Sequence, residues 1–267
     1  ALGYCYADIS DDKLDITNIL AHNASERKSS ELKFVINKKE VADFLRIQHF
    51  KRMNAANEQR RLRSPRRTLG EPKQYIGSKK GLIILVNFAD LSIKPEHTQT
   101  ELDNLFNQKG YSKNGSIGSV HDYFFDQSYG KFNLTFDVVG PVTVSKDFAY
   151  YGSNDPIYDN DSNPKDMIIE ACQLVNPIVN FSDYDWDGDG EVDQVFVIYA
   201  GYGEHAGAPA ETIWPHESRL GKRAITLDGT IINTYACSCE LVGSEGNVLT
   251  GIGTPCHEFS HCLGLPD

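Results

Sequence analysis

A nearly continuous run of apolar residues extends from Leu82 to Phe88, and a second buried-strand candidate extends from Val192 to Tyr199. Apolar runs of this length are typical of strands that are covered on both faces, as in a sheet between layers of helices. Residues 131–144 predict a further pair of strands, broken at Gly140-Pro141, where glycine and proline favour an interruption. The pattern therefore predicts a largely buried sheet.

Three segments between these strands are predicted to be helices. They cover residues 100–108, 119–128 and 163–175. In the third segment Asn163 caps the helix and Pro164 opens it. The apolar stripe of that helix consists of Met167, Ile168, Ala171, Cys172 and Val175. Helices among buried strands, without an internal repeat, predict an α/β (or α+β) domain with a mixed sheet flanked by helices.

The front of the chain has a different pattern. Residues 1–58 predict a small separate piece, with a strand at 14–20 and a helix that begins near residue 30 and runs toward Phe50. Five arginines then lie between Arg60 and Arg67, so residues 59–78 predict a basic linker before the main domain, 79–267. The linker is either a solvated tether or a site that an activating protease cuts, and charge alone does not separate the two.

Composition narrows the class of protein. The chain of 267 residues is 40% hydrophobic, which suffices for a substantial core. Its net charge of −11 argues against general binding to nucleic acid or anionic lipid, because polyanions would be repelled. No apolar run approaches the roughly 18 residues of a membrane span, and the first residues lack the pattern of an export signal, so any such signal is expected to be gone already.

Cysteine usage is less informative. The six cysteines, at positions 5, 172, 237, 239, 256 and 262, do not choose among their possible pairings. None shows the spacing of a structural zinc site, so buried thiols or an occasional disulfide are favoured.

The last residues of the chain carry a metal-site motif. His257 and His261 are four apart, so on a helix both imidazoles lie on one face and reach one metal ion at roughly 2.0 to 2.1 Å. Glu258 then lies beside the metal, where it can take a proton from a water activated by zinc. Gly264 permits a left-handed turn at the end of the helix, and Asp267 follows as the third ligand. The alternative is a helix whose two histidines are simply solvated.

A second cation site is predicted just before the strand at 192–199. Carboxylates alternate there, and numbering the loop from Asp185 puts Gly190 at the position where calcium loops bend sharply. The predicted calcium ligands are Asp185, Asp187, Asp189, Glu191 (through its backbone carbonyl) and Asp193. The twelfth position is Phe196 and a strand follows, so the loop is not an EF-hand. The alternative is a solvated acidic turn without an ion.

With these motifs in place, the chain resembles the immune inhibitor A family of secreted bacterial metallopeptidases, which are zinc proteases related to the metzincins. The resemblance covers roughly residues 70 to 267. It rests on the segments 81–88, 119–124, 128–130, 200–203, 213–216 and 251–267. Aspartate as third ligand, here Asp267, is characteristic of that family, whereas most metzincins use a third histidine.

The resemblance implies that the chain is part of a zymogen. The front is similar to the end of a propeptide, and Cys5 is either a zinc ligand that keeps the enzyme latent or an incidental thiol. Family members continue past the third ligand into a subdomain with a methionine-containing turn. Both methionines here, Met53 and Met167, lie far upstream, so residues 79–267 are expected to be the N-terminal part of a catalytic domain that continues beyond Asp267.

The expected function is that of a secreted or cell-surface zinc endopeptidase, with Glu258 as general base and proteins or peptides as substrates. His121, His205 and His216 are either groups at the rim of the site or structural residues. The alternative function is a non-catalytic secreted binding module in which the metals only hold the fold. A third possibility is an inert latent precursor, which proteolysis near Arg60 to Arg67 would activate.

Overall fold

The computed structural model describes residues 75–155 and 160–265. The strand and helix expected within residues 1–58, most of the linker at 59–78, Cys5 and the third ligand Asp267 lie outside the described residues. Among the described helices, none is both long and apolar enough to cross a membrane.

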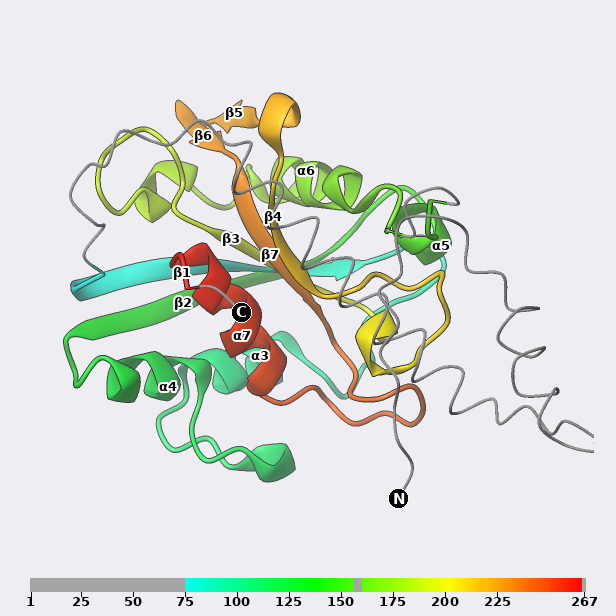
Figure 1. Ribbon diagram of the computed structural model, residues 1–267, viewed down its shortest axis with the longest axis horizontal. Coiled ribbons are helices and arrows are strands. Elements are labelled where there is room, and N and C mark those ends of the chain that lie inside the picture. Colours follow the sequence, from blue (N-terminus) through cyan, green and yellow to red (C-terminus); the bar gives the residue numbers. More distant parts are fainter. Residues whose placement is uncertain (1–74, 156–159, 266–267) are drawn as a thin grey trace, which may run out of the picture. The chain divides into compact units, whose positions relative to one another are not determined.

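A five-stranded sheet forms the centre of the described domain (Figure 1). Its strands, in spatial order, are β2 (Phe132–Thr143), β1 (Gly77–Asn87), β3 (Val195–Tyr199), β7 (Thr234–Cys239) and β4 (His216–Arg219). The first four run parallel, whereas β4 pairs antiparallel with β7 and forms one edge. The strands β5 (Ile225–Leu227) and β6 (Thr230–Ile232) make a separate antiparallel pair.

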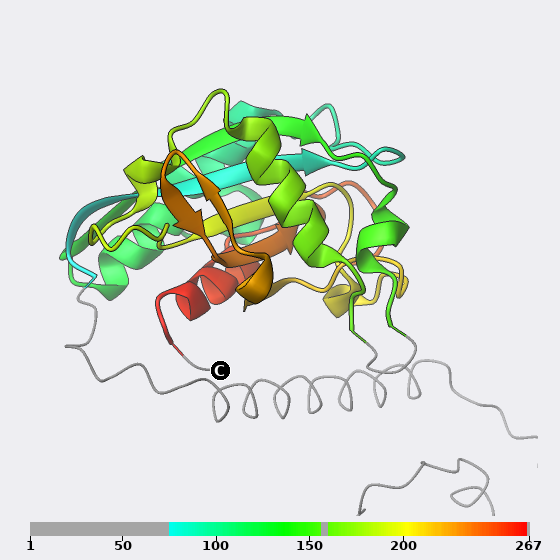
Figure 2. The ribbon, with the colours of Figure 1, turned by 90° about the horizontal axis from the view of Figure 1, so that it is seen from above.

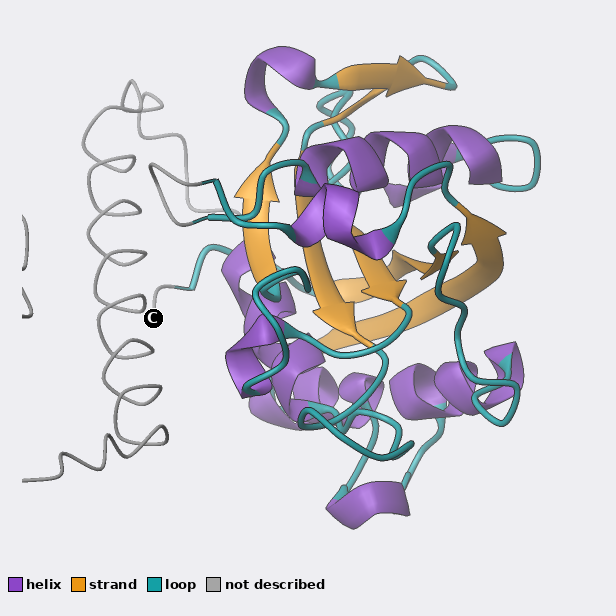
Figure 3. Cartoon of the chain, turned by 90° about the vertical axis from the view of Figure 1, so that its right-hand side faces the viewer, coloured by secondary structure: helices purple, strands orange, loops and turns teal. Residues whose placement is uncertain are grey.

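Helices cover both faces of this sheet, as Figures 1 and 3 show. On one face lie α3 (Gln99–Asn107), α4 (Val120–Gln127) and α7 (Gly253–Cys262). The opposite face carries α6 (Pro164–Val175), which lies over the middle of the sheet in Figure 2, and the short α5 (Phe148–Gly152). Single 3₁₀ turns are η1 (Lys113–Gly115), η2 (Phe181–Tyr184), η3 (Glu204–Ala206) and η4 (Gly221–Arg223). This arrangement confirms the predicted α/β class with a mixed sheet flanked by helices.

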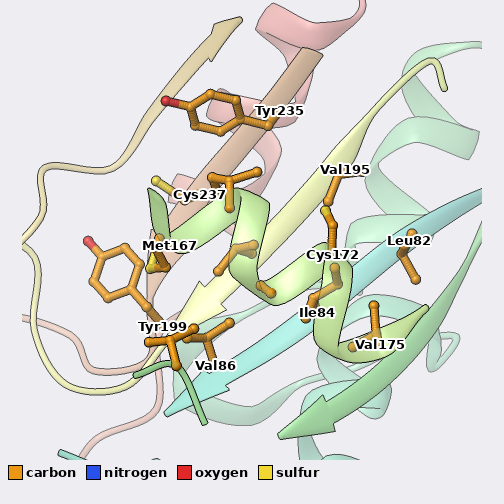
Figure 4. Close-up of a cluster of buried hydrophobic side chains, with 14 of the residues drawn as sticks. Leu82, Ile84, Val86, Met167, Cys172, Val175, Val195, Tyr199, Tyr235 and Cys237 are labelled. Atoms are coloured by element: carbon orange, nitrogen blue, oxygen red, sulfur yellow. The ribbon is translucent and has the colours of Figure 1, made fainter. Parts of the chain in front are cut away.

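The apolar run that predicted the first strand is buried on both faces. Alternate residues of β1 point to opposite sides, so Leu82, Ile84 and Val86 join the core under α6, whereas Ile83 and Leu85 join the core under α3, α4 and α7. All five are fully buried. Figure 4 shows the first core, in which the predicted stripe of α6 packs on β1 and β3.

The prediction of two strands within 131–144 was wrong, because β2 is a single strand. Both of its halves pair in parallel with β1, and a register shift between Ile84 and Val86 absorbs the break at Gly140-Pro141. Gly140 has a φ of +101°, and a Cβ there would lie 2.7 Å from the carbonyl oxygen of Leu85. Since β2 is an edge strand, the missing N–H of Pro141 is tolerated.

The predicted helices are confirmed to within a residue at each end. Ser119 forms a capping box with Asp122 at the start of α4, which explains why this helix begins where the sequence predicts. The strand expected from residue 192 begins at Val195 instead. The sequence patterns did not predict the strands β4 to β7.

Candidate metal centre and acidic loop

The helix α7 is held in one rotation by its apolar face. Cys256 and Phe259 are buried against the sheet, and the Phe259 ring lies 5.2 Å from that of Phe124, between ring centres. Because residues four apart share a helix face, this packing puts His257 and His261 together on the more exposed side. The carboxylate-bearing Glu258 is buried, with 7% of its surface exposed.

The geometry of the histidine pair fits a zinc ion. Nε2 of His257 lies 3.2 Å from Nε2 of His261. Two nitrogens at zinc-ligand distance from one tetrahedral ion would lie about 3.3 Å apart. Oxygen and nitrogen ligand atoms of His257, Glu258 and His261 all lie within 4.8 Å of one another. The structure therefore brings together three of the four residues predicted for this centre, and the fourth, Asp267, is outside the described residues.

A Schellman turn ends α7 as the sequence predicted. Gly264 has a φ of +86°, its N–H donates to the carbonyl of His261 (2.8 Å), and the N–H of Leu265 donates to that of Ser260 (3.1 Å). The turn places the Leu265 carbonyl where it accepts a hydrogen bond from Nδ1 of His261 (2.8 Å). In the neutral imidazole the proton is then on Nδ1, which leaves Nε2 as the nitrogen that can bind a metal.

Replacing Gly264 with alanine is expected to destabilise the domain by about 1–2 kcal/mol, since a Cβ is strained at this left-handed φ. Zinc affinity should fall as well, because the carbonyl that orients His261 shifts. Thermal melts and zinc titration of Gly264→Ala measure both effects. The matched control is Gly253→Ala in the same helix, where no atom lies within 4 Å of the added Cβ and the φ is ordinary. Equal behaviour of the two variants would contradict the prediction.

The acidic loop between η2 and β3 is folded around Asp185. The carboxylate of Asp185 accepts hydrogen bonds from the backbone N–H groups of Gly188 (2.8 Å) and Gly190 (2.9 Å). Asp193 accepts one from the N–H of Trp186 (2.5 Å). These bonds bend the loop back on itself.

Three of the five predicted calcium ligands are grouped in this loop. Carboxylate oxygens of Asp185, Asp187 and Asp193 lie within 4.8 Å of one another, with no ligand atom of Asp189 or Glu191 in the group. The side chain of Glu191 instead forms an ion pair with Arg219 of β4 (2.9 Å). The Glu191 side chain is therefore engaged elsewhere, and a cation role of its backbone carbonyl stays a prediction.

The acidic loop and His261 border the same hollow, a cavity of about 290 Å³. Its lining includes Asp189, Glu191 and Asp193 of the acidic loop, Glu217 and Arg219 of the edge strand β4, and His261 and Gly264. Glu217 and Arg219 were not predicted as site residues. The strand β4 has four residues, all of them polar, so it is too short to show the alternation of apolar and polar positions that identifies a strand. The sequence therefore gave no indication of these two residues.

The thiols near this centre are buried. The five described cysteines are all free. Burial raises the pKa of the Cys262 thiol well above its usual range and that of Cys256 to about 12, so both stay protonated at neutral pH.

The three histidines that were considered as groups at the rim of the site, His121, His205 and His216, contact neighbouring groups. Nδ1 of His216 bonds the Trp214 carbonyl (2.6 Å), and Nε2 lies 3.0 Å from the Tyr235 hydroxyl. His121 lies 2.9 Å from Asn133 Oδ1 and stacks on a phenylalanine ring. The His205 ring lies 6.2 Å from that of Trp214. These contacts favour structural roles over roles at the rim of the site.

Comparison with known proteins gives one family and several relatives. The family model described as "Immune inhibitor A peptidase M6, catalytic domain" matches residues 74–267. Pre-pro-metalloprotease PrtV of Vibrio cholerae serotype O1 is 30% identical over 226 residues, which cover 70% of this chain and 24% of the relative. Immune inhibitor A of Bacillus thuringiensis subsp. alesti is 25% identical over 228 residues, covering 70% of this chain and 33% of the relative. The chain thus spans about a quarter to a third of the length of these relatives.

Proposed function

Because the chain belongs to the immune inhibitor A peptidase M6 family, we propose that it is part of a zinc-dependent endopeptidase that is secreted or displayed at the cell surface. The observation that carries the proposal is the pair of Nε2 atoms 3.2 Å apart on His257 and His261, with the carboxylate of Glu258 beside them. His257, His261 and Asp267 would hold the zinc ion. When bound, zinc polarises the scissile carbonyl and makes a water acidic enough to attack it at neutral pH.

The proton transfers fall to Glu258. Its buried carboxylate accepts a proton from the attacking water, whose oxygen adds to the carbonyl carbon of the peptide. The same carboxyl group then gives the proton to the amide nitrogen as the C–N bond breaks. The Leu265 carbonyl keeps the proton of His261 on Nδ1, so the metal-binding nitrogen stays available through the cycle.

The edge strand β4 offers a place for the substrate backbone. It ends the sheet on the side of α7, and within residues 75–155 and 160–265 no strand pairs with its outer side. An extended peptide can add to such an edge through main-chain hydrogen bonds. Protein or peptide substrates are therefore proposed, bound along β4 above the histidine pair.

The proposal of a zinc peptidase is tested on the full-length protein. We expect one zinc ion per chain by metal analysis, casein digestion that stops when a chelator removes the zinc, and recovery when zinc is returned. Digestion that persists in metal-free protein would refute a zinc peptidase. A zinc-loaded protein that digests no protein after mild proteolysis would favour the non-catalytic binding module.

The zymogen form is proposed on the same family membership, with 1–58 as the end of a propeptide, 59–78 as the linker and 79–267 as the start of the catalytic domain. A relative whose name is "Pre-pro-metalloprotease" supports a proform. Arg60 to Arg67 would be the site for an activating protease, because a polar stretch with little to bury is readily cut.

Calcium is proposed as a structural ion in the acidic loop, bound by Asp185, Asp187, Asp189, Glu191 and Asp193. Grouped carboxylates repel one another unless a cation neutralises them. Adding calcium to zinc-loaded, calcium-free protein should therefore raise the melting temperature. At a hundredfold excess of calcium over Kd, the free energy of unfolding should increase by about 2.7 kcal/mol. Asp187→Asn should reduce this gain, whereas Asp126→Asn, an exposed carboxylate on α4, should keep it. A melt that calcium does not change would remove the site.

A further inference from the structure

Outside the acidic loop, Asn154 and Asp161 each carry a side-chain oxygen without a hydrogen-bond partner. Asn154 and Asp161 form an isolated antiparallel bridge. The backbone N–H of Asp155 donates to the carbonyl of Asn160 (2.7 Å). On the other side of the pair, the N–H of Ser162 donates to the carbonyl of Ser153 (3.0 Å). Asn154 and Asp161 are therefore a non-hydrogen-bonded pair, whose side chains lie on the same face with Cβ atoms roughly 4.5–5.5 Å apart.

Both side chains end in a buried oxygen that accepts nothing. Oδ1 of Asn154 and Oδ1 of Asp161 each expose less than 1 Å² and have no hydrogen-bond partner. Their other ends are committed, since Asp161 Oδ2 accepts the backbone N–H of Trp214 (3.0 Å). A buried acceptor without a partner costs free energy. A positive group that bound both oxygens would remove this cost for the two residues together.

Glu204 fixes the orientation of the asparagine. The amide nitrogen of Asn154 donates to both carboxylate oxygens of Glu204, at 3.3 and 3.5 Å. Turning the amide over would set its oxygen against that carboxylate, which is repulsive. The contact with Glu204 thus fixes which end of the Asn154 amide carries the oxygen, and it brings a second carboxylate next to Asn154.

No basic side chain of the described residues neutralises the carboxylate of Asp161. No lysine or arginine in the described part of the chain forms an ion pair with Asp161. Burial raises the pKa of Asp161 to about 8, and the charge of Glu204 adds to the rise. The environment therefore opposes a bare carboxylate and favours one that is bound by a cation or a proton.

We propose that Asn154, Asp161 and Glu204 form a second calcium site, in which the two unpartnered oxygens and the Glu204 carboxylate bind the ion. Calcium takes carboxylate and amide oxygens in flexible geometry and completes its shell with water, which fits a site of three side chains. The proposal is independent of peptidase activity and of the acidic loop.

A cation here would anchor one end of the edge strand. Asp161 holds the N–H of Trp214, two residues before β4 begins at His216. At the other end of β4, Arg219 pairs with Glu191 of the acidic loop. The two cation sites would thus stabilise opposite ends of the strand that is proposed to bind substrate.

The two tryptophans of the sequence allow the sites to be observed separately. Trp186 lies in the acidic loop and Trp214 is bonded to Asp161. Terbium replaces calcium in oxygen sites and luminesces when a nearby tryptophan transfers energy to it. In Trp186→Phe, we expect terbium emission excited through Trp214, and calcium should displace it.

Adding Asp161→Asn to Trp186→Phe should weaken this terbium binding by roughly tenfold or more, because one ligand loses its charge. The matched control adds Glu211→Gln, an exposed carboxylate of the same region, and should bind as tightly as Trp186→Phe alone. Glu204→Gln repeats the test if the Asp161 variant does not fold, as judged by circular dichroism. Calcium titration calorimetry should also count about one ion fewer in Asp161→Asn than in Glu211→Gln.

Two results would overturn the proposal. One is equal terbium affinity and equal calcium stoichiometry in the Asp161, Glu204 and Glu211 variants. The other is an absence of calcium-displaceable emission through Trp214 in folded Trp186→Phe, which would mean that a proton on Asp161 alone occupies the space between the two oxygens.

Discussion

Glu258→Gln in the full-length protein is expected to lower peptide-bond turnover by roughly 10²- to 10⁴-fold while zinc content stays unchanged. The amide keeps the size of the buried side chain but cannot accept the proton of the attacking water. His257 and His261 do not depend on that proton, so the pair of Nε2 atoms remains competent to bind the metal.

The measurement is casein digestion and zinc content for the variant beside wild type, after the same activation by proteolysis. Glu245→Gln is the matched control, because Glu245 is exposed in a loop outside the hollow and loses the same charge. The control should digest at the wild-type rate. If Glu258→Gln retains that rate with zinc bound, another group accepts the proton and the assignment fails.

The sequence was most informative where one physical constraint acts on neighbouring residues. The run from Leu82 to Phe88 predicted β1 because both faces of that strand are covered, so the five consecutive positions from Leu82 to Val86 are all apolar. The histidine pair was readable because a helix puts residues four apart on one face. The acidic loop was readable because its carboxylates alternate within nine residues, from Asp185 to Asp193.

The sequence analysis missed elements whose structure depends on contacts with distant parts of the chain. The strand β7, Thr234–Cys239, contains mostly small and polar residues, and it is buried because layers cover both faces of the sheet: Tyr235 and Cys237 join one core and Ala236 joins the other. The break at Gly140-Pro141 suggested two strands, since the pattern does not show that both halves follow the same neighbour.

The proposed second calcium site could not be predicted for the same reason. Asn154 and Glu204 are 50 residues apart in sequence, and neither belongs to a motif. Asn154 and Asp161 are near each other in sequence, whereas Glu204 comes from a distant segment, and only the folded chain brings its carboxylate to Asn154. Periodicity and spacing report local geometry, whereas a site assembled from distant segments depends on tertiary contacts.

Phe259→Ala is expected to destabilise the domain by about 3–5 kcal/mol, the usual cost of removing a buried aromatic ring. Phe259 is 1% exposed, and its ring lies 5.2 Å from Phe124 and 5.6 Å from Phe136, between ring centres. Each kcal/mol corresponds to roughly 2–4 °C in melting temperature for a domain of this size. Zinc affinity should fall too, because these contacts fix the rotation of α7 and hence the position of both histidines.

Thermal melts and zinc titration of Phe259→Ala measure the two losses together. Phe125→Ala is the matched control, since that ring is 40% exposed and, among the rings of the described residues, stacks only on the half-buried His121. It should cost less than about 1 kcal/mol. Equal losses in the two variants would mean that α7 is held by contacts other than its apolar face. Comparison with Glu258→Gln separates two roles of α7. Loss of the Phe259 ring should lower stability and zinc affinity, whereas loss of the Glu258 carboxylate should lower only the turnover.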